Sequence, residues 1–148
     1  MPVNAEVEGR AYPPTPPYVV SRAKIREFAD AVGAQDPVHR DVDAARAKGY
    51  ADVVAPPTFL VSVAQQGEGA AIIDPEAGID FSRLVHGEQK FIHHRPAVAG
   101  DEITAATTID RIRQAGGHSM VTLTTSITDA HGEAICTATS LMVIRGED

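Results

Sequence analysis

Residues 55–64 read Ala55-Pro56-Pro57-Thr58-Phe59-Leu60-Val61-Ser62-Val63-Ala64. A helix is expected to begin near Thr58, directly after two prolines, which have no backbone N–H to give to a preceding turn. The residues that follow are apolar on nearly every face, and the pattern continues less regularly to Ile72 or Ile73. A helix that is apolar all round is enclosed by other parts of the protein. The stretch therefore predicts one long central helix that something else wraps.

Strand patterns in the second half of the chain predict the structure that wraps this helix. Residues Met120–Thr128 alternate with a period of two, and Ile103–Ile112 is rich in β-branched side chains. Asp129–Gly132 is typical of a hairpin turn before a last strand over Ala134–Ile144, and Glu88–His94 is a further strand candidate. Three long antiparallel strands in a row form a meander. A meander around one helix predicts an α+β layered fold.

The first half of the chain is expected to be mostly helical. The proline-rich stretch Tyr12–Tyr18 cannot be helical and is expected to be an extended lead-in. Ser21 is a plausible N-cap for a helix that ends at Gly33, and a short helix is expected over Val42 to Lys48. No repeat or linker divides the chain, so a single domain over residues 1–148 is expected.

Composition excludes several classes of function. The 148 residues carry a net charge of −7 without a basic run, which argues against a nucleic-acid surface. No apolar run approaches the roughly 20 residues that cross a bilayer, so no membrane partner is expected. The single cysteine, Cys136, forbids an internal disulfide and favours a reducing compartment, which predicts a cytoplasmic protein.

A loop between two helical patterns holds the strongest functional candidate. It contains Asp36, Pro37 and His39. Histidine suits acid–base work on a carbonyl compound, and the free backbone N–H groups near Thr58 and Phe59, at the start of the central helix, are candidates for an oxyanion site. The pattern predicts a site in which a loop histidine faces a helix N-terminus.

Four features together resemble the MaoC-like hot-dog dehydratases, and most closely their FAS1-like dehydratase branch, common in actinobacteria. The resemblance runs from about Val7 to Ile144. It is carried by the helix–loop–helix pattern, the Ala55–Phe59 helix entry, the strand His86-Gly87-Glu88-Gln89-Lys90-Phe91 and the turn Arg95-Pro96…Ala99-Gly100-Asp101.

The resemblance implies a hot-dog fold, with an antiparallel sheet wrapped around a long central helix and two such units paired side by side. It also implies an acyl thioester of CoA or acyl carrier protein as ligand. The implied reaction is the reversible dehydration of an (R)-3-hydroxyacyl thioester in fatty-acid metabolism, a hydro-lyase reaction for which no cofactor or metal is expected. The partner is a second copy of the chain or a different MaoC-like subunit.

The motif of active relatives reads Gly-Asp-x-Asn-Pro-(aliphatic)-His. Here Gly33, Pro37 and His39 match it, but Ala34 stands in the place of the catalytic aspartate. Two roles are open for Asp36, three residues before the histidine. It could hold a water together with His39, or it could bond its own backbone and shape the turn, which is the role we favour.

The other histidines invite weaker interpretations. His93 and His94 follow one another on a strand and so point to opposite faces, which argues against a shared metal ion. His86 is placed by the resemblance beside the central helix, as a substrate-binding or a structural histidine, with the structural role favoured.

Two classes of function follow. The first is a 3-hydroxyacyl-thioester dehydratase, or enoyl-thioester hydratase, with His39 as its acid–base residue. The second is a subunit that shapes the acyl channel while a partner carries the complete Asp/His pair. An acyl thioesterase ranks third, because no group is placed to activate water at the carbonyl carbon.

Overall fold

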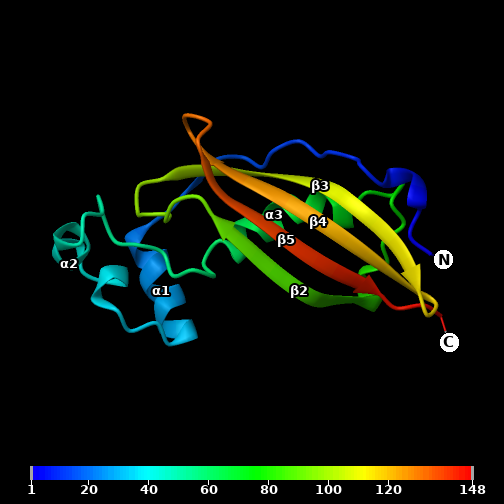
Figure 1. The fold of residues 1–148 in the computed structure, drawn as a ribbon, viewed down its shortest axis with the longest axis horizontal. Helices are drawn as coiled ribbons and strands as arrows, with labels where there is room; N and C mark the ends of the chain where they lie inside the picture. The colour runs from blue at the N-terminus through cyan, green and yellow to red at the C-terminus, as the bar shows by residue number, and fades with distance from the viewer. Residues whose placement is uncertain (1, 148) are drawn as a thin grey trace.

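The computed structural model describes residues 2–147, which form a curled antiparallel sheet with a helix along one face (Figure 1). The strands are β1 (Tyr18–Val19), β2 (Leu84–His93), β3 (Glu102–Ala115), β4 (His118–Asp129) and β5 (Ala134–Ile144). Their order in the sheet is β1-β3-β4-β5-β2, so β1 and β2 are its two edges. The helices are α1 (Arg22–Val32), α2 (Val42–Ala47) and α3 (Val61–Ile72), and the 3-10 turns are η1 (Ala5–Val7), η2 (Pro37–His39) and η3 (Phe81–Arg83).

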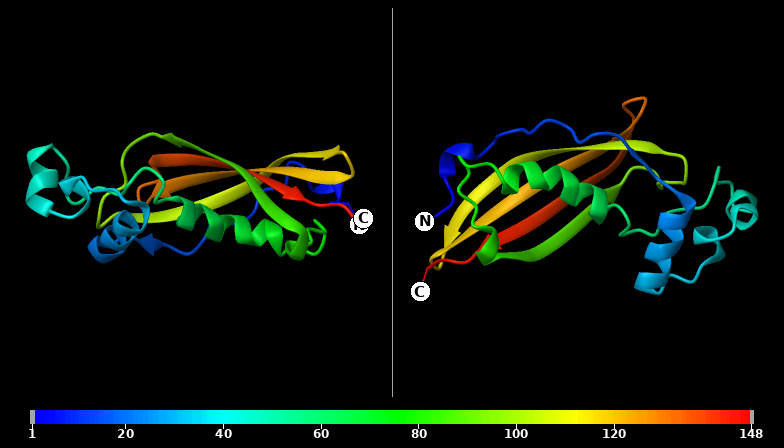
Figure 2. Two further views of the ribbon diagram at one scale, coloured as in Figure 1. Left: turned by 90° about the horizontal axis from the view of Figure 1, so that it is seen from below. Right: turned by 180° about the vertical axis from the view of Figure 1, so that it is seen from behind.

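Helix α3 lies along one face of the sheet, as both views in Figure 2 show. The predicted central helix is confirmed: Thr58 lies in the turn that leads into α3, and α3 ends at Ile72. Val63 and Ala64 are fully buried against the sheet, whereas Gln65 and Gln66 remain exposed. The sheet therefore covers one side of the helix and leaves the other flank open.

The meander of β3, β4 and β5 is confirmed, and β2 adds to it beyond β5. Inward-facing side chains pack with α3 in two buried aliphatic clusters. They include Ile103, Ala105, Ile109, Leu123, Ile127, Ala138 and Met142. A long helix held in the curl of an antiparallel sheet is the predicted α+β hot-dog fold.

Two β-bulges interrupt the sheet near the same cross-strand row. One extra residue of β3 lies between Ile109 and Arg111, and one extra residue of β2 lies between His86 and Glu88. Bulges increase the local twist of a strand, so these two promote the curl of the sheet around α3.

The helical end of the molecule lies beyond the sheet, at the left of Figure 1. The Ser21 side chain accepts the Lys24 N–H at the start of α1, and Gly33 ends the helix in the left-handed conformation with a φ of 73°. The N-cap predicted at Ser21 and the stop predicted at Gly33 are thus confirmed. Edge-to-face packing of Phe28 on Phe59, with ring centroids 5.5 Å apart, ties α1 to the entry of α3.

Some boundaries differ from those predicted. β2 begins at Leu84 rather than Glu88, because its pairing with β5 continues through the bulge at Gly87. The end of the proline-rich lead-in forms the short strand β1, which pairs with β3. Within residues 2–147, no helix is both long and apolar enough to cross a bilayer.

Candidate active site

The loop before α2 is built around the carboxylate of Asp36. Its Oδ1 accepts the Val38 N–H at 3.0 Å and so caps η2, and its Oδ2 lies 3.6 Å from Lys48 Nζ. The Val38 hydrogen bond, followed by the charge of Lys48, holds the Asp36 pKa below its ordinary value. Asp36 therefore has the turn-shaping role that we favoured.

His39 is held in one orientation at the end of η2. Its Nδ1 lies 2.6 Å from the backbone carbonyl oxygen of Val54, and its side chain is half-buried. A carbonyl oxygen can only accept, so Nδ1 carries the hydrogen. This bond selects the tautomer in which Nε2, rather than Nδ1, is the ring nitrogen that can accept a proton.

Arg40 fixes the other end of the loop. Its guanidinium donates to the Ala34 carbonyl oxygen at 2.6 Å and forms an ion pair with Asp30 on α1. The Ala34 N–H donates to Ala29 O at 2.9 Å. Position 34 is therefore well ordered by its backbone, but its methyl side chain offers no group for proton transfer.

His39 lines a cavity of about 470 Å³, a size common for small-molecule sites. The lining comes from the η2 loop, the connection into α3 and the end of β2. It comprises Asp36, Val38, His39, Tyr50, Val54, Ala55, Pro56, Pro57, Leu60, His93, His94, Arg95, Pro96 and Ala97. Most of these side chains are apolar, so the cavity offers a ligand mainly apolar contacts.

One wall of this cavity is held by Arg95, which the sequence analysis placed only in a turn. Its guanidinium makes two hydrogen bonds to Asp101, at 2.9 and 3.0 Å, and a third to Asp129 at 3.1 Å. The hydrogen bonds to Asp101 and then to Asp129 raise the Arg95 pKa, so the charge is permanent. The wall is therefore tied both to the turn after β2 and to the β4–β5 hairpin.

The two neighbouring histidines take separate roles. His93 stacks on Phe91 with ring centroids 5.7 Å apart, while His94 Nε2 lies 3.0 Å from Thr137 Oγ1. Within residues 2–147, no group of three potential metal-binding side chains occurs.

The predicted oxyanion groups do not join His39 at the cavity. The Phe59 N–H is not free, because it donates to Pro56 O at 3.0 Å, and the Phe59 ring is buried in the core. Thr58 is exposed in the turn before α3 and does not line the cavity. This corrects the expectation of a free N–H at Phe59: the chain turns once before α3 begins, and that turn uses the Phe59 donor.

His86 also lies away from His39. It is exposed on β2, and its Nε2 lies 3.0 Å from Glu88 O across the bulge. The cavity lining does not include it.

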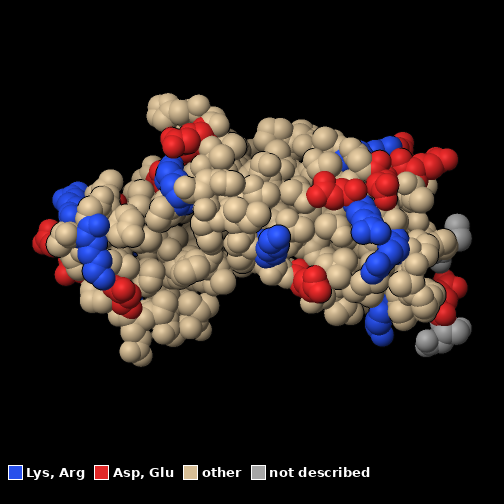
Figure 3. Space-filling model, in the orientation of Figure 1, with Lys and Arg blue, Asp and Glu red and all other residues tan. Residues whose placement is uncertain are grey.

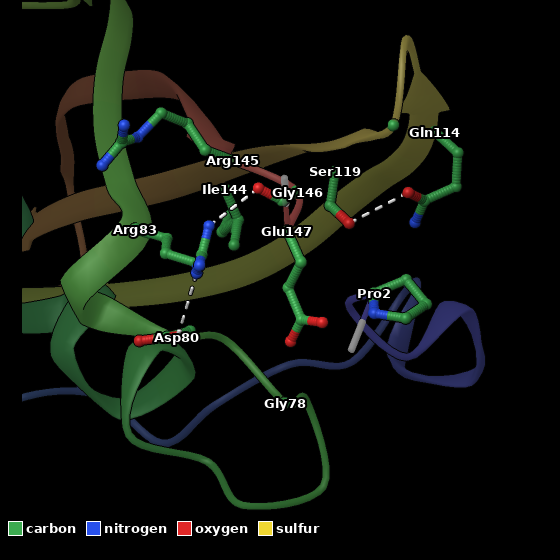
Figure 4. Close-up of a pocket in the computed structure, with 11 residues that line it drawn as sticks. Pro2, Gly78, Asp80, Arg83, Gln114, Ser119, Ile144, Arg145, Gly146 and Glu147 are labelled. Carbon is green, nitrogen blue, oxygen red and sulfur yellow. Dashed lines mark hydrogen bonds and ion pairs between the residues drawn. The ribbon is translucent and has the colours of Figure 1, made fainter.

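A second, larger cavity of about 610 Å³ lies at the opposite end of the molecule, near both chain termini (Figures 1 and 4). Arg83 spans it, donating to Gly146 O at 2.7 Å and pairing with Asp80. Ser119 donates to Gln114 in the same cavity. None of the predicted site residues lines it, so the candidate site is the smaller cavity at His39.

Comparisons with known proteins fit this geometry. Residues 7–138 match the model of the "FAS1-like, dehydratase domain region". The chain belongs to this family of MaoC-like proteins. A UPF0336 protein of Leifsonia xyli is 53% identical over 148 residues, which is 100% of this chain and 99% of that protein.

Solved structures of MaoC-like proteins share the fold. A MaoC-like dehydratase superposes with a TM-score of 0.88 at 35% identity over 96% of this chain, which spans only 43% of that longer chain. The HadBC complex of Mycobacterium tuberculosis, a 3R-hydroxyacyl-ACP dehydratase, has a TM-score of 0.80 at 30% identity, covering 93% of this chain and 96% of the other. The MaoC-like fold is therefore found here with a histidine at position 39 and no carboxylate at position 34.

Proposed function

We propose that this chain is one subunit of an (R)-specific 3-hydroxyacyl-thioester dehydratase, which equally hydrates enoyl thioesters. The observation that carries the proposal is the incomplete acid–base pair in the η2 loop. His39 lines an apolar cavity, whereas Ala34 has no carboxylate and the Asp36 carboxylate caps η2. A partner hot-dog unit would supply the missing carboxylate, as the two-component HadBC dehydratase complex suggests. The proposed substrates are acyl-CoA or acyl-carrier-protein thioesters of cytoplasmic fatty-acid metabolism.

The chemistry assigned to His39 is proton transfer. Dehydration requires a base for the acidic α-proton, an acid for the departing β-hydroxyl and donors for the thioester oxygen as it gains enolate character. In the neutral imidazole, Nε2 of His39 carries the lone pair because Nδ1–H is directed to Val54 O. It therefore serves as the base in one direction and returns the proton in the other.

A second function is favoured by one residue. Because Ala34 cannot exchange a proton, the chain could bind the acyl group while all the chemistry belongs to the partner. His39 would then only line the channel. The two functions differ in what loss of the imidazole does to turnover.

The test is hydration of a short enoyl-CoA by the purified chain, measured as kcat/KM. We expect weak activity in the wild type and its loss in His39→Ala. The double variant Ala34→Asp with Asp36→Asn should gain activity, by about 10²–10⁴-fold for one positioned acid or base. Asparagine keeps the side-chain oxygen that caps η2, so the loop should persist. His94→Gln, which changes another histidine of the same cavity, is the matched control and should retain activity.

Each contrary outcome has a clear meaning. Wild-type activity in His39→Ala would place the catalytic base elsewhere. A wild type as fast as the double variant would remove the need for a partner carboxylate. If the wild type and the double variant are both inert but a saturated acyl-CoA still binds, the chain is the acyl-binding subunit without chemistry.

A further inference from the structure

Glu68 is a carboxyl group buried in the middle of the central helix. Only 1% of its surface is exposed, and it is the one ionisable residue among the buried polar residues of the described chain. Burial raises the pKa of this carboxyl; a hydrogen bond donated by Ser140 would lower it, as the charge of His86 does. No part of the proposed chemistry uses Glu68, because it does not line the cavity at His39.

The hydrogen bonds around Glu68 need one more donor than an ionised carboxylate allows. Ser140 Oγ lies 2.6 Å from Glu68 Oε1 and 2.8 Å from Gln89 Oε1. A serine hydroxyl has a single hydrogen, so it can donate to only one of these two oxygens. If it donates to Gln89, the short contact with Glu68 requires a hydrogen on the carboxyl group.

The orientation of the Gln89 amide supports this assignment. Its Nε2 lies 3.3 Å from Thr139 O and 3.4 Å from Lys90 O, both of which are acceptors. Turning the amide over would bring Oε1 against these two carbonyl oxygens and lose both bonds. Gln89 Oε1 is therefore the acceptor that faces Ser140.

The second oxygen of Glu68 gives an independent reason. Oε2 is buried and has no hydrogen-bond partner within residues 2–147. An unpartnered buried atom is far more costly when it shares a negative charge than when it is the carbonyl oxygen of a neutral acid. The neutral form removes that charge without any rearrangement.

The charges near Glu68 do not offset burial. From β2, His86 is the one titratable group that acts on it, and this imidazole is exposed to solvent, which screens its charge. The inward-facing side chains beside it on β3, β4 and β5 are uncharged: Ala105, Thr107, Thr125, Ala138, Ser140 and Met142. No cation lies among them to stabilise a carboxylate.

We propose that Glu68 is held as a neutral acid in the folded chain and donates its hydrogen to Ser140, which donates in turn to Gln89. These hydrogen bonds hold the edge strand β2 to helix α3, and loss of the Glu68 proton breaks that connection. The free edge of the sheet thereby becomes sensitive to pH. The consequence matters for assembly, because β2 is the edge on which a second hot-dog unit would dock.

The sign of the pH effect follows from the raised pKa. The folded chain keeps a proton that the unfolded chain releases near the ordinary glutamate value of about 4.3. The stability that Glu68 contributes is therefore fully present below that value, and it is lost as the pH rises through the folded pKa.

The first experiment measures the free energy of unfolding against pH for the wild type, Glu68→Gln and Glu133→Gln. Glutamine imitates the neutral acid, so Glu68→Gln should lack the decline that the wild type shows above the unfolded pKa. Glu133 is exposed beside the β4–β5 hairpin, and its variant should decline as the wild type does. Parallel wild-type and Glu68→Gln curves would overturn the proposal.

A second experiment uses the wild type alone, so its result does not depend on whether a variant folds. In the wild type, carbon NMR of the Glu68 carboxyl should report the protonated form at pH values where exposed glutamates have already ionised. Hydrogen-exchange protection of the β2 amides paired with β5 should fall as that signal titrates. A Glu68 signal that titrates with the exposed glutamates would overturn the proposal. No substrate is involved, so either outcome is independent of the dehydratase activity.

Discussion

The side chain of Asp36 illustrates how a single position serves the fold at the expense of chemistry. It caps η2 through the Val38 N–H and faces Lys48, and the interaction with Lys48 requires the ionised carboxylate. A group that bonds its own loop in this way is poorly placed to exchange a proton with substrate. The loop keeps its shape, and His39 keeps its orientation, because Asp36 caps η2.

We predict that Asp36→Ala lowers the thermal midpoint of unfolding more than Asp36→Asn does, because asparagine retains the capping oxygen and loses only the charge that faces Lys48. The pH dependence has a definite sign. A folded pKa below the unfolded value means that this stabilisation is present above the unfolded pKa and is lost as the pH falls through the folded pKa. Thermal unfolding of the three proteins between neutral and acid pH measures both effects. Equal losses in Asp36→Ala and Asp36→Asn would contradict the capping role.

For single residues, the sequence predicts the role of a side chain when its interaction partner lies close along the chain. Asp36 bonds Val38 two residues away, so its turn-shaping role could be anticipated. Arg95 also bonds Asp129, 34 residues away, and Glu68 contacts Ser140, 72 residues away; no local pattern reveals either contact. The signal that could have found Glu68 is that it is the one charged residue of helix α3.

Helix α3 approaches β3 most closely at a glycine. A Cβ at Gly67 would lie 2.7 Å from Thr107 Oγ1 and 3.2 Å from Ala105 Cβ, whereas a Cβ at Gly69 would meet nothing within 4 Å. The two glycines are half a helical turn apart. Substituting each in turn therefore separates the effect of packing on stability from the effect of helix propensity. Gly67 is required by the contact, and Gly69 is not.

We predict that Gly67→Ala destabilises the protein by about 1–3 kcal/mol, because overpacking at β3 outweighs the gain in helix propensity. Gly69→Ala should stabilise it by up to about 1 kcal/mol. Chemical denaturation of both variants gives the two free energies. If the two substitutions shift stability in the same direction, the close packing of α3 on β3 is not what Gly67 provides.

The elements that could be predicted are those with strong local signals. Ser21 and Gly33 mark the ends of α1, and the alternation in β4 is visible without its neighbours. β1 could not be predicted as a strand, since its two residues are extended by pairing with β3, some 85 residues later. The first residues of β2 were missed for a similar reason, because Gly87 resembles a break unless β5 is known to continue beside it.

In the molecule as a whole, the sheet has an edge, at β2, that no further strand of the described chain covers. β2 is paired on one side only, and Val85 and Ile92 on it are each 48% exposed. Nearby, two further apolar side chains are exposed: Phe81 in η3 (72%) and Ile73 just after α3 (79%). On the sheet face opposite α3, charged side chains gather mainly toward the two ends, and the middle is largely uncharged (Figure 3). Open apolar edges are normally covered by a partner.

We predict an obligate dimer that joins sheets along β2, either of two copies or with a different MaoC-like subunit. The double variant Val85→Lys with Ile92→Lys should abolish it, because lysine on an edge strand opposes pairing. Val19→Lys, at a 62% exposed position on the opposite edge strand β1, is the matched control and should leave the assembly unchanged. Light scattering at micromolar concentration gives the masses. A wild-type chain that stays at 15.7 kDa, alone and with MaoC-like subunits, would contradict this prediction.

The two bulges bear on how chain length can vary between relatives. Gly87 and Asp110 are the unpaired extra residues of β2 and β3, and they flank the cross-strand row through Thr122 and Leu141. Removing a residue elsewhere in a strand would turn every following side chain to the wrong face. Removing either of these two would instead restore regular pairing, with all inward side chains still inward. Ile135 of β5 is a third extra residue, but its side chain is fully buried, so single-residue deletions in evolution should be tolerated at Gly87 and Asp110 before any others in the sheet.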